Sequence, residues 1–228
     1  MKKKILYSVI ICFLVLINSG CGLPTYLYLY SPSDFFKSSE SQLALEHNIS
    51  NYDSSEGSDQ SFKGYEIYYR VYDSSTAAQS DIDSLVSMAS NYEGYPDSFM
   101  TYATSSLDFV RLRSVSSNES PVISISNPSD SAVFYVNLND GAEWSLNDGD
   151  NSILSYLARS ITSDFSTRGS FFTSSNYESG DDDYEGSDAP AAIYFAFYTV
   201  AFGSDPETFE TVYSDPVIID SYLSYTPR

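Results

Sequence analysis

The stretch FKGYEIYYRVY, residues 62–72, decides the fold of this chain. Two sets of side chains alternate along it. One set is Tyr65, Ile67, Tyr69 and Val71, and the other is Glu66, Tyr68, Arg70 and Tyr72. Alternation with a period of two, in a run rich in β-branched and aromatic residues, is typical of a β-strand with one buried face.

A second apolar run, residues 191–202, lies far downstream and is apolar on both of its faces. Such a run is typical of a central strand that is covered on both sides. Residues 203–207 turn the chain, and residues 209–220 would return as an edge strand interrupted by Asp215-Pro216. We therefore expect residues 62–72 and 191–202 to share one β-layer.

Shorter segments predict the remaining elements. We expect strands at 42–49, 107–115, 121–125, 132–138 and 142–146, with Asn139-Asp140-Gly141 as a hairpin turn. Residues 76–92 have apolar positions at helical spacing and a capping-box pair, Thr76 and Gln79, which predicts a helix ended by Gly94 and Pro96. Residues 153–161 are ambiguous, because Ile153, Leu157 and Ile161 fit a helix but the run is of marginal length. Residues 170–173 fit a short strand. Residues 174–190 are polar and acidic and predict a solvated loop.

The N-terminus has the pattern of an export signal. Three lysines at positions 2–4 precede an apolar run at 5–17, which is shorter than the ~20 residues that span a bilayer. Ser19 and Gly20 then precede Cys21. This ending resembles a bacterial lipobox, with Asn18 where lipoboxes usually carry leucine, a looser form similar to that of spirochaete lipoproteins.

The lipobox resemblance implies that Cys21 is lipidated on sulfur, cleaved from Gly20 and acylated on its new amine. The alternative is cleavage by the ordinary signal peptidase, with Cys21 as a chance thiol. The predicted divisions are a signal peptide at 1–20, a tether at 21–40 and a single β-rich domain at 41–223. In residues 22–40, alternating tyrosines at 26, 28 and 30 fit either a first strand or an aromatic tether near lipid headgroups.

The mature charge excludes one class of partner. Removing residues 1–20 leaves 8 basic and 31 acidic residues, a net charge of −23. Nucleic-acid binding needs clustered lysine and arginine, so we exclude it. The same acidic charge argues against a polybasic contact with anionic lipids, so membrane attachment would depend on the acyl chains on Cys21. No cysteine follows Cys21, so the fold must be stabilised by its hydrophobic core and not by an internal disulfide.

Residues 64–72 are similar to the third strand of a fibronectin type III domain. Residues 191–203 and the later Tyr213-Ser214-Asp215-Pro216-Val217 are similar to its last two strands. The pattern departs from that family, because Trp144 is far from the second strand and a long segment separates the two matches. The resemblance implies a mainly β (α+β) antiparallel sandwich with a large insertion, residues 73–190, that carries at least one helix. It implies a binding or scaffold role.

Catalytic groups are sparse in the sequence. His47 is the only histidine, so a site with several imidazoles is impossible and a serine triad would depend on it alone. It falls in an expected strand, which favours a structural role, and no G-x-S-x-G elbow exists. We therefore predict no enzymatic activity and no cofactor. An exported glycan-acting hydrolase that uses paired carboxylates remains the alternative.

Two sets of residues are candidate ligand contacts. The acidic run is Asp181, Asp182, Asp183, Glu185 and Asp188, which could supply oxygen ligands to calcium but lacks EF-hand spacing. A solvated loop explains it as well, and a calcium-dependent adhesion module is a further alternative. The second set is Tyr68, Arg70 and Tyr72, a possible ligand surface of rigid aromatic contacts. The competing interpretation is that the inserted segment covers this face.

Together these patterns predict a lipid-anchored protein of the bacterial cell envelope. It would be held in the cell membrane or outer membrane, on the exported side, by the lipid on Cys21. We expect a non-enzymatic binding or structural module whose ligand would be a protein or a glycan.

Overall fold

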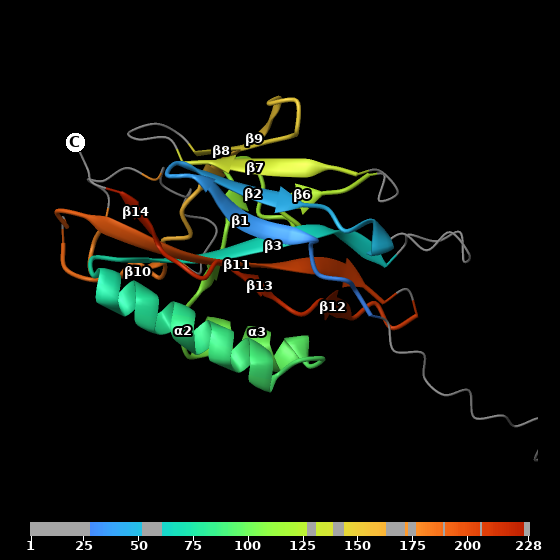
Figure 1. Ribbon diagram of the computed structural model, residues 1–228, viewed down its shortest axis with the longest axis horizontal. Helices are drawn as coiled ribbons and strands as arrows, with labels where there is room; N and C mark the ends of the chain where they lie inside the picture. The colour runs from blue at the N-terminus through green and yellow to red at the C-terminus, as the bar shows by residue number, and fades with distance from the viewer. Residues whose placement is uncertain are drawn as a thin grey trace, which may run out of the picture.

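The computed structural model describes residues 28–51, 61–126, 131–138, 144–162, 172, 177–188, 190–205 and 207–225. These residues form two β-sheets that pack as a sandwich, with helices on one outer face (Figure 1). The predicted mainly β, sandwich-like class is confirmed. Cys21 and the predicted signal peptide lie outside the described residues.

The first sheet has the order β1-β2-β7-β8-β9-β5 and is antiparallel throughout. Its strands are β1 (Asp34–Ser39), β2 (Gln42–Glu46), β7 (Val133–Asn137), β8 (Trp144–Asn147), β9 (Ile153–Ala158) and β5 (Arg113–Ser114). A single 3-10 turn, η1 (Ile49–Asn51), follows β2.

The second sheet is organised around β3 (Phe62–Tyr72) and β11 (Ile193–Ser204). The shorter strands at its margins are β4 (Val110–Arg111), β6 (Ile123–Ser124), β10 (Tyr184–Glu185), β12 (Thr211–Tyr213), β13 (Val217–Ile218) and β14 (Leu223–Tyr225). β10 runs parallel to β3, and the other pairings in this sheet are antiparallel.

The predicted pairing of the two long strands is confirmed. β3 and β11 run antiparallel from the pair Tyr72–Tyr194 to the pair Phe62–Gly203. Near the start of β3, Gly64 has a φ of 148°, and a Cβ there would lie 1.9 Å from the carbonyl oxygen of Ile123 on β6. A glycine is therefore required for β6 to approach β3.

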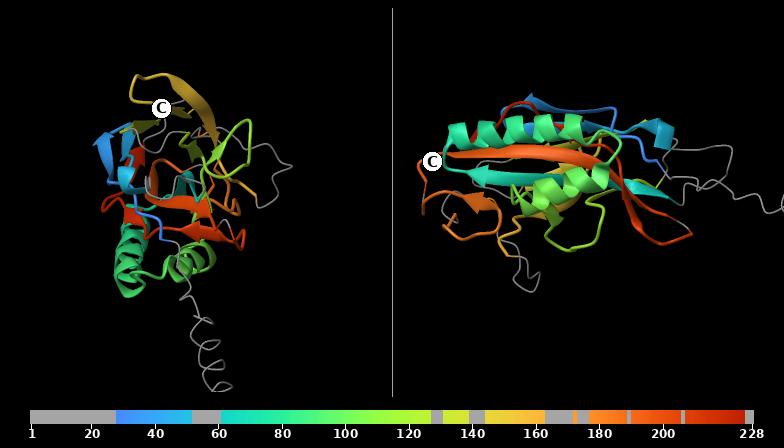
Figure 2. Two further views of the ribbon diagram at one scale, coloured as in Figure 1. Left: turned by 90° about the vertical axis from the view of Figure 1, so that its right-hand side faces the viewer. Right: turned by 90° about the horizontal axis from the view of Figure 1, so that it is seen from below.

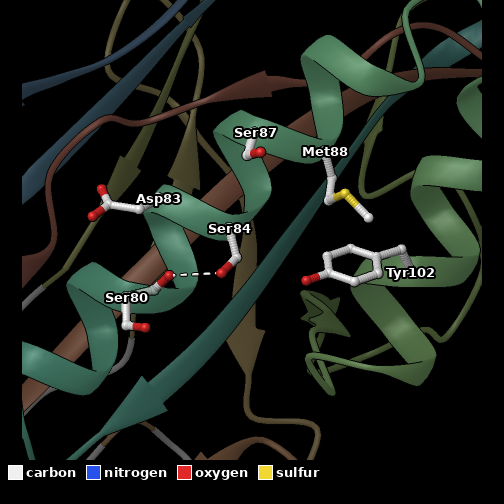
Figure 3. Close-up of a pocket in the computed structure, with 6 residues that line it drawn as sticks. All are labelled: Ser80, Asp83, Ser84, Ser87, Met88 and Tyr102. Carbon is white, nitrogen blue, oxygen red and sulfur yellow. Dashed lines mark hydrogen bonds between the residues drawn. The ribbon is translucent and has the colours of Figure 1, made fainter.

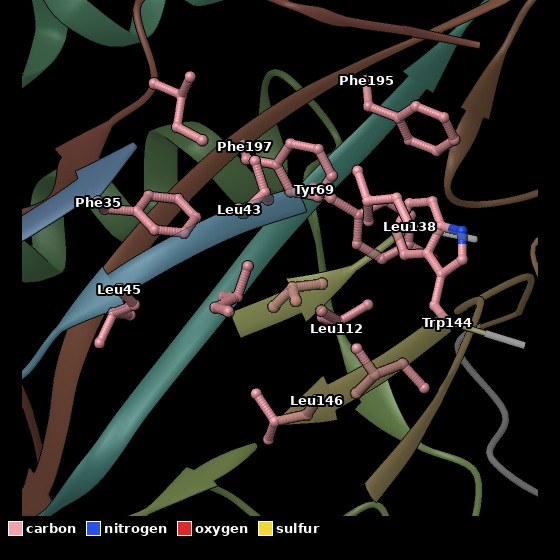
Figure 4. Packing of buried hydrophobic residues seen from close by; sticks show 14 of the residues in the cluster. Phe35, Leu43, Leu45, Tyr69, Leu112, Leu138, Trp144, Leu146, Phe195 and Phe197 are labelled. Carbon is pink, nitrogen blue, oxygen red and sulfur yellow. The ribbon is translucent and has the colours of Figure 1, made fainter. Parts of the chain in front are cut away.

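The main core fills the space between the sheets. The inward side of β3 contributes Tyr65, Ile67, Tyr69 and Val71, which pack with leucine and phenylalanine side chains of the first sheet (Figure 4). Trp144 stacks on Phe172 with their ring centroids 3.6 Å apart. Burial of these apolar and aromatic surfaces is the dominant source of stability in a fold of this kind.

The other face of the second sheet is covered by α2 (Ser75–Asn91) and α3 (Pro96–Ser105), as Figures 1 and 2 show. Ala78, Ile82 and Leu85 of α2 pack against this face in a second core cluster, together with Phe99 of α3. Tyr198 of β11 is fully buried beneath them. β3 and β11 are thus buried on both faces.

The helices differ in detail from the prediction. α2 begins at Ser75, and the side chain of Ser74, not Thr76, caps it by accepting a hydrogen bond from the amide of Ala77. α3 was not predicted, because Pro96 was interpreted only as the end of the preceding helix. Pro96 stands at the start of α3, where its missing N–H costs nothing and its fixed φ suits the helix.

The segment 73–190 is not a separate insertion. It supplies β5, β7, β8 and β9 to the first sheet and β4, β6 and β10 to the second. The chain crosses between sheets within a few residues, since β4 belongs to the second sheet and β5 to the first. The sandwich therefore depends on this segment.

One ambiguity is resolved and two further expectations are corrected. Residues 153–158 form a strand, because β9 pairs with both β8 and β5. β10 lies within the predicted solvated loop. β1 lies within the predicted tether, so the folded domain begins before residue 41. The predicted hairpin turn at 139–141 lies outside the described residues, as does all of 170–173 except Phe172.

No helix in the described part of the chain combines the length and apolar character needed to cross a bilayer.

Candidate functional site

A buried charge network lies between the end of β9 and the start of β10. Arg159 donates from Nε to Oδ2 of Asp183 at 3.0 Å and from Nη2 to Oδ1 at 2.5 Å. The same Nη2 donates to Asp181 at 2.8 Å. The guanidinium also lies 3.9 Å from the centroid of the Tyr177 ring, in a cation–π contact. Two hydrogen bonds in a parallel fork are the strongest form of this ion pair.

Tyr69 connects this network to β3. Its hydroxyl donates to Oδ2 of Asp183 at 2.6 Å and accepts from the amide of Ser160 at 2.7 Å. Burial, followed by the charge of Asp183, raises the pKa of Tyr69 well above its ordinary value. Burial alone would lower the pKa of Arg159, but the charge and hydrogen bonds of Asp183 raise it. Tyr69 therefore stays protonated and Arg159 stays charged.

The acidic run is divided among separate partners. Asp183 and Asp181 bind Arg159, while Glu185 binds Arg70 at 3.0 Å. Asp188 accepts from the amide of Ser179 at 2.7 Å, which lowers the pKa of Asp188. Asp182 is exposed. Within the described ranges, no three side chains of histidine, cysteine, aspartate or glutamate are grouped as a metal site.

Arg70 borders a polar pocket of about 460 Å³ beside this network. The pocket is lined by Arg70, Thr104, Asp108, Val110, Asp181, Asp182 and Tyr184. Arg70 binds Asp108 at 3.0 Å, Glu185, and the carbonyl of Leu107, and its Nε is buried without a hydrogen bond. Burial and then the charge of Asp73 raise the pKa of Tyr184 to about 12, so this hydroxyl is protonated. The wall thus presents carboxylate acceptors, while the hydroxyls of Thr104 and Tyr184 already donate to backbone carbonyls.

Tyr68 and Tyr72 do not form the exposed surface that we considered. Both are buried beneath α2 and α3, as the competing interpretation proposed. Tyr68 stacks on Tyr198 and donates to Glu66 at 2.6 Å, and Tyr72 donates to Asp81 at 2.8 Å. Burial raises the pKa of both tyrosines, and their carboxylate partners add to the effect. Arg70 of this set lines the polar pocket described above.

Glu66 is a buried carboxylate that the sequence pattern did not single out. It is 1% exposed and is held by Tyr68 and by Nη1 of Arg111, the latter at 3.1 Å. Its place on the alternating face of β3 suggested a solvent-facing charge. The covering helices, and the arginine on the adjacent strand β4, reverse that expectation.

A second pocket, of about 370 Å³, lies between the two helices (Figure 3). It is lined by Ser80, Asp83, Ser84, Ser87, Met88 and Tyr102. The hydroxyl of Ser84 is already bound to the carbonyl of Ser80 at 2.9 Å within α2. This pocket depends on α3, which the sequence analysis did not predict.

His47 lies at the end of β2 in a structural setting. Its Nδ1 is 2.7 Å from the hydroxyl of Tyr65, and its ring stacks on Phe62. The Tyr65 hydroxyl also accepts from the amide of Asn48 at 2.9 Å. Burial raises the pKa of Tyr65 to about 12. These contacts secure the start of β3 against β2 and account for the histidine.

No family model, curated protein or solved structure matches this chain. The fibronectin type III resemblance accordingly stays a prediction, while the sandwich-like class rests on the sheet topology itself.

Proposed function

We propose that this protein is a lipid-anchored component of a bacterial cell envelope that acts as a non-enzymatic binding or structural module. The observation that carries this proposal is the N-terminal pattern of three lysines, an apolar run at 5–17 and Ser19-Gly20-Cys21. Cleavage before Cys21 would leave a lipid-bearing residue seven positions before Tyr28, the first described residue. The protein would be held in the cell membrane or outer membrane on its exported side.

The start of the folded domain supports the anchor. Leu29 is buried in the main core, and the amide and carbonyl of Tyr30 each bond the side chain of Asn51 at 2.8 Å. The hydroxyl of Ser31 donates to the carbonyl of Asp215 at 2.6 Å. The described chain is therefore packed into the domain within ten residues of the proposed lipid site.

The setting of the buried charges supports a non-enzymatic role. The carboxylates of Asp183 and Glu66 are committed to arginines and to tyrosine hydroxyls. Ion pairs and hydrogen bonds of this kind hold the strands in position. They leave these carboxylates little capacity to transfer a proton to or from a substrate. The pocket beside Arg70 is one place where the described part of the fold offers polar groups to a ligand.

Metabolic labelling with a radioactive fatty acid tests the anchor. We expect label in the wild-type chain and none in Cys21→Ala. Cys12→Ala is the matched control, because Cys12 lies in the apolar run that cleavage removes. The Cys12→Ala chain should be labelled like the wild type. Equal labelling of Cys21→Ala, or an unlabelled wild type, would refute the proposal.

A further inference from the structure

Large hydrophobic side chains are exposed at the end of the sandwich where the described chain begins. They are Tyr28 at 55%, Tyr30 at 46%, Ile49 at 56%, Tyr95 at 70% and Phe209 at 84% exposed. We call these five residues the aromatic end. Tyr95 lies between α2 and α3, and Phe209 in the turn between β11 and β12. Both connections lie at that end of the molecule (Figures 1 and 2).

Specific contacts bring these segments together. The rings of Tyr28 and Tyr30 meet edge to face with centroids 5.2 Å apart, and Tyr30 is bonded to Asn51 of η1, the turn that carries Ile49. The amide of Gly94, next to Tyr95, donates to Asp215 at 3.0 Å. Leu29 lies against Gly203 near the end of β11, where a Cβ would be 3.1 Å from the leucine side chain.

Phe209 is the most exposed residue of the group, and its backbone is unusual. Its φ is 61°, a conformation that non-glycine residues adopt rarely. Its amide donates to the carbonyl of Asp205 at 2.8 Å, which fixes the turn. The turn therefore holds a phenylalanine out into solvent instead of folding it onto the sheet.

We propose that the aromatic end rests on the surface of the membrane, at the level of the lipid headgroups. This inference rests on the proposed lipid anchor at Cys21. Only residues 22–27 separate Cys21 from Tyr28, and seven peptide steps reach roughly 25 Å when fully extended. The aromatic end is thus the part of the domain that the chain length keeps nearest the bilayer. Tyrosine and phenylalanine suit the boundary between headgroups and acyl chains.

The charge around the aromatic end selects the lipid. Glu93, Asp205, Glu207, Glu210 and Asp215 lie in the same segments. Such a surface is repelled by anionic headgroups and gains nothing from a polybasic contact. The partner is therefore a zwitterionic phospholipid surface. The same carboxylates oppose the pairing of two copies of this chain through this end.

A contrasting hydrophobic patch serves as a control. Ile153, Leu154 and Tyr156 of β9 are also exposed, but β9 lies on the opposite side of the molecule from the helices and away from the chain entry (Figure 1). The anchor does not bring this patch to the bilayer. If exposed hydrophobic residues were sufficient for membrane contact, both patches would contact lipid. The proposed orientation predicts that only the aromatic end does.

Spin labels on the anchored full-length protein test the orientation. A nitroxide is attached to Thr208→Cys beside Phe209, or to Ser152→Cys beside β9, in protein reconstituted in phosphatidylcholine vesicles. Both positions are exposed, and lipidation of Cys21 leaves the new cysteine as the sole free thiol. We expect the label at 208 to be more accessible to oxygen, which concentrates in lipid, than to a water-soluble nickel chelate. The label at 152 should show the reverse.

Replacing Phe209 and Tyr95 with serine should shift the label at 208 towards the aqueous result while the protein stays anchored. If both labels in anchored wild-type protein are more accessible to the nickel chelate than to oxygen, the proposed orientation is wrong, while the lipid anchor stands. Dipolar broadening of the spectrum of the label at 208 would show that two labels lie close together. The aromatic end would then contact a second copy of the chain, and the proposed orientation would be wrong. If the protein is instead recovered unlipidated and free of vesicles, the proposed lipid anchor is wrong. Fatty-acid labelling detects that failure separately.

Discussion

Arg159 and Asp183 form an ion pair with no solvent exposure that joins the two sheets of the sandwich. Arg159 directly follows β9 of the first sheet, and Asp183 directly precedes β10 of the second. Tyr69 of β3 bonds the same carboxylate from within the core. Desolvation makes such a pair a weak source of net stability, but it makes the loss of one partner costly.

Arg159→Met should therefore destabilise the protein strongly. The substitution leaves Asp183 buried without its cation, and removal of one partner from a buried pair costs about 3–5 kcal/mol. Urea unfolding monitored by circular dichroism measures the change. Lys37→Met is the control, since Lys37 pairs with Glu40 on the surface at 2.7 Å and such pairs are worth about 1 kcal/mol or less. Equal losses in the two variants would contradict a structural role for the network.

Gly64→Ala should also destabilise the fold. A methyl group at this position would lie 1.9 Å from the Ile123 carbonyl oxygen, and the φ of 148° is unfavourable for alanine. Backbone strain alone costs about 1–3 kcal/mol, and the clash would force β6 away from β3. Gly149→Ala is the matched control, because a Cβ there meets nothing closer than Val133 O at 3.5 Å. Thermal unfolding should separate the two variants, and similar melting temperatures would refute this account of Gly64.

Stability should fall steeply above pH 10. Burial raises the pKa of Tyr65 to about 12 and that of Tyr198 well above its ordinary value of 10.0. Above pH 10 the unfolded chain releases phenolic protons that the folded chain retains, so rising pH favours unfolding. Each such tyrosine lowers the free energy of unfolding by about 1.4 kcal/mol per pH unit until its folded pKa is reached. Below pH 10 these tyrosines contribute no slope.

Urea titrations from pH 9 to 12 measure this dependence. Tyr198→Phe removes one linked proton while keeping the aromatic packing, because the Tyr198 hydroxyl donates a weak hydrogen bond to the Met100 sulfur at 3.8 Å. Its slope should be shallower than that of the wild type. Constant stability across this range would show that the buried tyrosines ionise freely in the folded protein.

Calcium should not stabilise the domain. The carboxylates of Asp181, Asp183 and Glu185 are bonded to arginines, and a cation would have to displace those guanidinium groups. We expect the same melting temperature in millimolar calcium chloride as in a chelator. Arg159→Met is an informative comparison, because it frees two aspartates. A rise in the melting temperature of the wild type with calcium would revive the adhesion-module alternative.

The long strands of the second sheet were predictable because period-two alternation and a fully apolar run are local signals. β3 and β11 were found and paired on that basis. α3 was missed because a proline is compatible both with the end of one helix and with the first turn of the next, and Pro96 was interpreted only as an end. The segment that forms β9 stayed ambiguous because Ile153, Leu157 and Ile161 fit either period over so short a run.

The candidate site was harder to foresee. Asp183 belongs to an acidic run that composition alone assigns to solvent, and its burial depends on Arg159, which lies 24 residues earlier in the chain. Glu66 is buried for the same kind of reason, since its partner Arg111 comes from another strand. Contacts between residues distant in sequence decide where these charges lie, and no local pattern records them.

The mass of the mature protein purified from membranes tests the central claim most directly. The proposed processing predicts a chain that begins at Cys21 and carries the added mass of a diacylglyceryl group on sulfur and an acyl group on the new amine. The first tryptic peptide should carry all of the added mass. A mature chain that begins at another residue, or an unmodified Cys21, would contradict the account.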